Sequence, residues 1–128
     1  MPYSIEKLSD KNVILVTFTG LITRVDVIAS MKEVVVMADS LPRPIYQIGD
    51  FRQAEGTFSS VFEIVRTFPM MWRLYANNNI TGPIAVNDLN NPWLKMSHTL
   101  ALKIRLKEML MFPTIEDALH YIQNQEVI

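Results

Sequence analysis

The stretch that decides the fold is Val13-Ile14-Leu15-Val16-Thr17-Phe18, an unbroken run of aliphatic, β-branched and aromatic residues. Such residues fit a pleated, buried surface, so the run predicts a strand. A weaker strand pattern covers residues 3–8, and the polar turn Asp10-Lys11-Asn12 separates the two. The two segments therefore predict an antiparallel hairpin, and Gly20 is expected to end its second strand.

Beyond the hairpin, helical and strand patterns alternate to the end of the chain. A helix is expected from Thr23, because a threonine followed three residues later by Asp26 forms a capping pair. Pro69 should kink or restart the second helix, since proline lacks a backbone donor. The remaining expected elements are strands at 45–48, 83–87 and 109–112, a loop at 53–56, and helices from Thr57 or Ser59, from Asn91 and from Thr114.

This order of elements defines a fold class. Strands that are separated by helices pair in parallel through right-handed crossovers, whereas the first hairpin adds an antiparallel edge. We therefore expect an α/β fold with a mixed, mostly parallel sheet of about five strands and about four helices. A chain of 128 residues without a linker or repeat is expected to form a single domain over residues 1–128.

Composition excludes several classes of function. The chain has no cysteine, which removes disulfide frameworks, zinc–thiolate sites and thiol nucleophiles. A net charge of −1 gives no electrostatic reason to expect nucleic acid as a partner. The first residues do not form a signal peptide, and no apolar run approaches the roughly 20 residues of a membrane span. A cytoplasmic protein without a membrane span is expected.

No catalytic or metal-binding motif stands out. The four glycines form neither a phosphate-binding loop nor a dinucleotide fingerprint. No nucleophile elbow precedes a helix, and the only histidines, His98 and His120, fall on different predicted helices. No catalytic residue, metal or cofactor is therefore assigned from the sequence.

Polar residues follow two predicted parallel strands and form a candidate ligand rim. In open α/β sheets, ligands bind outside the carboxyl ends of the strands. A pair of carboxylates there suits acid–base chemistry or a divalent cation, but loop acids and asparagines also cap helices and make turns. The residues of this candidate rim are Asp50, Arg52, Asn87 and Asp88.

The segment Phe68-Pro69-Met70-Met71-Trp72-Arg73-Leu74-Tyr75 is dense in large apolar side chains. It is too crowded for one helix face, so some side chains are expected to stay outside the core. Exposed aromatic residues, methionine and arginine are typical of an interface, whereas a fully buried, kinked helix is the alternative. The candidate interface residues are Phe68, Met70, Met71, Trp72 and Tyr75.

Three patterns together resemble a known family. They are Ile48-Gly49-Asp50-Phe51 at a strand end, Ile84-Ala85-Val86-Asn87-Asp88 with Trp93 shortly after, and the closing Met111-Phe112-Pro113-Thr114-Ile115-Glu116-Asp117-Ala118-Leu119. With the order of elements, they look like the SpoIIAA-like branch of the STAS superfamily, the domains of sulphate transporters and anti-sigma-factor antagonists. The resemblance covers nearly the whole chain and implies a STAS-like fold.

The resemblance also implies a switch. In classical antagonists, a partner kinase phosphorylates a serine or threonine at the start of the helix after the third strand. The equivalent stretch here departs from the family's Asp-Ser-Ser/Thr-Gly pattern, and Glu55-Gly56-Thr57 is its nearest match. The candidate phosphorylation sites are Thr57, Ser59 and Ser60, for which helix capping is the structural alternative.

These observations favour a non-enzymatic protein–protein interaction or regulatory domain, expected to be homodimeric and to take part in signalling, with another regulatory protein as a further partner. The alternative is a carrier or sensor of a small lipophilic ligand, by analogy of shape with lipid-binding domains. An enzyme that uses Asp50 and Asp88 is the least favoured hypothesis.

Overall fold

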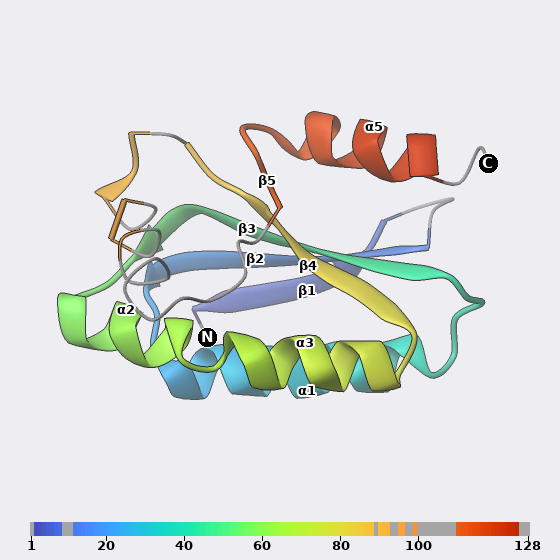
Figure 1. Ribbon diagram of the computed structural model, residues 1–128, viewed down its shortest axis with the longest axis horizontal. Coiled ribbons are helices and arrows are strands. Elements are labelled where there is room, and N and C mark those ends of the chain that lie inside the picture. Colours follow the sequence, from blue (N-terminus) through green and yellow to red (C-terminus); the bar gives the residue numbers. More distant parts are fainter. Residues whose placement is uncertain are drawn as a thin grey trace.

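A five-stranded sheet organises the computed structural model of the chain (Figure 1). The structure describes residues 2–8, 12–88, 90–92, 95–96, 99 and 110–125. The strands lie in the order β1-β2-β3-β4-β5, so each strand neighbours the next one in sequence. Their bounds are β1 Tyr3–Lys7, β2 Val13–Leu21, β3 Ile45–Glu55, β4 Ile80–Val86 and β5 Met111–Phe112.

The pairing of the strands confirms the mixed sheet. β1 pairs antiparallel with β2, and every later neighbouring pair is parallel. The hairpin therefore leaves β1 as one edge strand, and the long crossovers carry the helices over the faces of the sheet. The predicted fold class, with its antiparallel N-terminal hairpin, is confirmed.

Helices cover both faces of the sheet. The helices α1 (Arg24–Ala38), α2 (Phe58–Val65) and α3 (Phe68–Asn77) lie on one face, and α5 (Ile115–Gln125) lies on the other (Figure 1). Successive residues of a strand point to opposite faces. Ile14 and Val16 of β2 accordingly join the apolar cluster under α1–α3, whereas Val13 and Leu15 join the cluster under α5.

Local sequence signals set several helix ends. Thr23 and Asp26 form the expected capping box at the start of α1, with each side chain bonded to the other residue's backbone N–H. Thr67 donates its hydroxyl to the Ile64 carbonyl at the end of α2, and Pro69 stands in the first turn of α3. Proline is accepted there because its missing N–H would have no helical partner. The predicted restart at Pro69 is therefore confirmed.

Two predicted strand ends are wrong. Gly20 does not end β2, which continues to Leu21, and the expected loop at 53–56 is strand as far as Glu55. The two segments extend together, because Thr19, Gly20 and Leu21 pair with residues 53–55 after a register shift. Gly20 takes a φ of +70° within this pairing, a conformation that glycine adopts without a side-chain clash.

Part of the prediction falls outside the described residues. The helix expected from Asn91, including Trp93 and His98, lies largely outside them, whereas His120 is exposed on α5. Among the helices that the structure describes, none is long and apolar enough to cross a membrane.

Candidate functional site

The strand-end rim brings together some of the polar residues that the sequence predicts. A groove of about 530 Å³ lies where β3 ends and the chain leaves β4. Of the four predicted rim residues, Arg52 and Asp88 line this groove, whereas Asp50 and Asn87 lie beneath the surface. The remaining lining residues are Gln53, Ala54, Glu55, Gly56, Asn90, Asn91 and Pro92.

Asp50 is engaged in a close ion pair rather than free to react. Its side chain is 8% exposed, and it accepts from Arg52 Nε at 2.9 Å, Arg52 Nη2 at 2.8 Å and the Arg52 backbone N–H at 3.1 Å. Two parallel charge-assisted bonds fix both side chains. The hydrogen bond to Asp50 raises the pKa of Arg52 above its usual value. The pair therefore presents little net charge to a ligand.

The second half of the rim is built from turn contacts. Asp88 Oδ1 accepts from the Asn90 backbone N–H at 2.9 Å, and Asn87 Oδ1 accepts from the Asp88 N–H at 2.9 Å. Asn87 is almost fully buried, and its Nδ2 has no hydrogen-bond partner among the described residues. Within those residues, no group of three His, Cys, Asp or Glu side chains is placed to hold a metal ion. These contacts are those of a turn that follows β4.

The three candidate phosphorylation sites lie at the start of α2. The Thr57 hydroxyl caps this helix by accepting from the Ser60 N–H at 3.1 Å, and the Ser60 hydroxyl donates to the Thr57 carbonyl at 3.0 Å. Ser59 is exposed in the first turn. Capping therefore accounts for two of the three hydroxyls, and phosphorylation stays a prediction.

The predicted interface on α3 needs correction at three of its five residues. Phe68, Met71 and Tyr75 are buried in the cluster under α1–α3, because the helix turns this face to the sheet. Burial also raises the pKa of Tyr75. Met70 is exposed, and Trp72 is partly buried, with its ring tilted against Phe68 at a centroid distance of 5.9 Å. Two separate side chains do not make the apolar patch that the sequence suggested.

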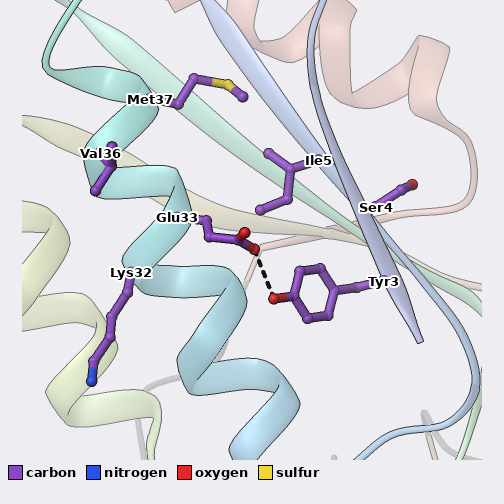
Figure 2. A pocket seen from close by; sticks show the side chains of 7 residues that line it. All are labelled: Tyr3, Ser4, Ile5, Lys32, Glu33, Val36 and Met37. Atoms are coloured by element: carbon purple, nitrogen blue, oxygen red, sulfur yellow. Dashed lines mark hydrogen bonds between the residues drawn. The ribbon is translucent and has the colours of Figure 1, made fainter. Parts of the chain in front are cut away.

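A further groove, with both apolar and charged residues in its lining, lies between β1 and α1 (Figure 2). This groove of about 660 Å³ is called the β1/α1 groove here. Val36 on its rim is 72% exposed, whereas Ile5 and Met37 are partly buried. The residues that line the groove are Tyr3, Ser4, Ile5, Lys32, Glu33, Val36 and Met37.

One polar contact crosses the β1/α1 groove. The Tyr3 hydroxyl on β1 donates to Glu33 Oε2 on α1 at 2.7 Å, as Figure 2 shows. This hydrogen bond, followed by burial and the negative charge, raises the pKa of Tyr3 to about 12. The contact places the Glu33 carboxylate, which can accept further hydrogen bonds, beside the edge strand β1.

The sequence contains one indication of this groove, but the helical periodicity of α1 hides it. Val34-Val35-Val36 places three β-branched residues in one helical turn, and a helix packed on a sheet buries only part of each turn. Val34 is fully buried, so Val36, two positions on, falls on the opposite side and faces solvent. The groove itself depends on β1 lying beside α1, which no local pattern specifies.

The topology defines a class: this chain has the SpoIIAA-like fold, which confirms the resemblance seen in the sequence at the level of fold. One matching solved structure is that of an uncharacterized protein of the DUF3478 family from Shewanella loihica PV-4. The two are 14% identical with a TM-score of 0.53, over 93% of this chain and 90% of the other. No family model matches the sequence, and a search of curated proteins finds no relative.

Proposed function

We propose that this chain is a non-enzymatic protein-interaction domain that acts as a homodimer in a regulatory role. The observation that carries the proposal is the β1/α1 groove, where the edge strand β1 meets a side of α1 that carries both apolar and charged residues. Exposed apolar surface beside an unpaired strand edge is a common recognition surface, because main-chain bonds add affinity and side chains add specificity.

The state of the polar residues supports a binding role over an enzymatic one. Asp50 is held by Arg52, and Asp88 bonds to the turn that follows it. A general base needs an available carboxylate within reach of a substrate proton. Within the described part of the chain, the two predicted acids are instead engaged with their neighbours.

A small lipophilic ligand is the second candidate function. The apolar side chains of the β1/α1 groove favour it, with Ile5 on β1 and Met37 on α1 (Figure 2). Ligand sites are typically apolar with a few polar groups that fix orientation. Tyr3 and Glu33 would supply such groups for a ligand with one polar end.

Sedimentation velocity of the full chain, over a concentration series into the high micromolar range, tests the homodimer. The expected result is a shift from monomer to dimer as concentration rises. A monomer throughout the series would overturn the homodimer proposal. Native mass spectrometry of the freshly purified protein tests the alternative, since a carrier would retain a bound small molecule and a pure interaction domain would not.

A further inference from the structure

The edge strand β1 offers a defined set of backbone groups to a partner. Thr19 N donates to the Pro2 carbonyl at 2.8 Å, and Leu8 N donates to the Val13 carbonyl at 2.9 Å. In an antiparallel pair, residues alternate between those bonded to the neighbouring strand and those that point away from it. The even-numbered residues of β1 therefore bond to β2, and the N–H and C=O groups of Tyr3, Ile5 and Lys7 point outward.

We propose that these outward groups pair with β1 of a second copy of this chain, antiparallel and around a two-fold axis at Ile5. This inference rests on the proposed homodimer and names its surface. The pairing joins the two sheets edge to edge. Each copy contributes the same surface to the interface, as two-fold symmetry requires. Tyr3 then lies opposite Lys7 of the partner subunit, and Ser4 lies opposite Glu6 of the partner subunit.

Strand length and charge select this register among its neighbours. An axis at Ile5 pairs the whole of β1, Tyr3–Lys7, with itself. An axis at Glu6 would place two carboxylates opposite each other, and an axis at Lys7 would place two ammonium groups opposite each other. Directly opposed like charges destabilise a strand pair. An axis nearer Tyr3 would leave the charged end of each strand unpaired.

The side chains across this interface have complementary charges. Tyr3, Ile5 and Lys7 share one face of β1, because side chains alternate along a strand. Tyr3 reaches Glu33 on α1 at 2.7 Å, as seen in Figure 2. The partner's Lys7, placed opposite Tyr3, therefore comes beside the Glu33 carboxylate. The symmetry repeats the contact, so two such ion pairs flank the axis.

Apolar contacts complete the same surface. Ile5 faces its counterpart at the axis, on the side of the sheet that carries α1. Each copy also brings a partly buried Met37 to the edge of its groove. A second copy therefore covers apolar surface with apolar surface, whereas an unrelated extended peptide brings no helix of its own to cover Met37.

The test combines charge reversal with rescue in the full chain. Lys7→Glu places a carboxylate against Glu33 and should raise the dimer dissociation constant at least tenfold in sedimentation equilibrium. Glu33→Lys should weaken the dimer similarly, and the double variant should restore the dissociation constant to near that of the wild type. Lys95→Glu is the matched control, because Lys95 is exposed one helical turn after Asn91, which lines the groove at the end of β3, and makes the same change of charge.

A second variant guards against a folding artefact. Ile5→Lys places two ammonium groups opposite each other at the axis and changes a side chain that is only partly buried, so circular dichroism should show an intact fold while the dimer weakens at least tenfold. A wild-type dimer that neither Lys7→Glu nor Ile5→Lys weakens would overturn this interface and leave the homodimer standing. Weakening by Lys7→Glu without rescue in the double variant would overturn the register. A wild-type monomer that retains a bound small molecule would overturn both proposals.

Discussion

Asp50 shows how a residue that looks reactive in sequence becomes structural in the fold. It is almost buried and is the last residue of β3 that pairs with β4, and Nε and Nη2 of Arg52 both donate to its carboxylate. Removing the charge from such a partner leaves the remaining group poorly compensated. Asp50 therefore contributes stability at a position where family resemblance and strand-end rules had suggested function.

We expect Asp50→Asn to lower the free energy of unfolding by about 1–2 kcal/mol, because charge-assisted hydrogen bonds to Arg52 are lost and Arg52 remains partly solvated. Urea denaturation measures the difference. Asp88→Asn is the matched control: Asp88 is exposed, and asparagine keeps an acceptor for the Asn90 N–H, so its effect should stay within about 0.5 kcal/mol. Equal effects of the two substitutions would contradict the structural role of Asp50.

Tyr3 provides a pH-dependent test at the β1/α1 groove. Its pKa is raised from 10.0 to about 12, first by the hydrogen bond to Glu33 and then by burial. A raised pKa favours the neutral phenol in the fold, so this stabilisation is complete below about pH 10 and disappears toward pH 12. Glu33→Gln removes the charge and should return the pKa of Tyr3 toward its ordinary value, measured by ultraviolet difference titration against Tyr3→Phe. An unchanged titration curve in Glu33→Gln would contradict the contact.

At the scale of elements, the junction of β3 and β4 depends on one glycine. The register shifts between Tyr46 and Ile48, where Gly82 and Pro83 of β4 lie across from Gln47 alone. Gly82 has a φ of +145°, and a Cβ there would lie 2.6 Å from the Gln47 carbonyl oxygen. Such a bulge needs a residue without a side chain at its tightest point.

Gly82→Ala should therefore destabilise the fold by about 3 kcal/mol or more, since strain and a backbone clash combine. Gly20→Ala is the comparison, because Gly20 has a φ of +70° but no described atom within 4 Å of the added Cβ. Its cost should be about 1–2 kcal/mol, from backbone conformation alone. Thermal and urea unfolding of both variants measure the difference. Similar losses in the free energy of unfolding would show that the clash with Gln47 does not determine the cost at Gly82.

The sequence predicted those elements whose signals are local. The Thr23–Asp26 capping box and the helix restart at Pro69 each depend on residues within one turn of each other, and both are present in the structure. The extensions of β2 and β3 were missed, because they arise from pairing between residues 19–21 and 53–55. Apart from Ala54, these residues are exposed, so hydrophobic periodicity gives little sign of the strands.

The sequence likewise placed some of the candidate site residues correctly and others not. Strand-end logic correctly brought Arg52 and Asp88 to one groove, because chain topology alone determines which ends of parallel strands meet. Composition overestimated how many side chains of α3 are exposed, since the density of apolar residues does not reveal which of them face the sheet. Met71 and Tyr75 are buried there, whereas the β1/α1 groove joins residues about thirty positions apart in sequence, as Tyr3 and Glu33 are.

At the scale of the whole molecule, the sheet has two unlike edges. β1 is a five-residue strand with charged residues at its end, and β5 is two residues long. Natural sheets limit edge pairing by short strands and charges. In the proposed pairing, Lys7 meets Glu33 of the partner subunit, so the charges that discourage unrelated strands would favour a second copy of this chain.

Hydrogen exchange of individual β1 amides, followed by NMR at low and high protein concentration, tests the homodimer most directly. Ile5 and Lys7 have N–H groups that point away from β2, so we predict fast exchange in the dilute monomer and protection that grows with concentration. Glu6, bonded toward β2, serves as the internal control and should be protected at both concentrations. Fast exchange at Ile5 and Lys7 at all concentrations, in a sample that sediments as a dimer, would contradict pairing through β1.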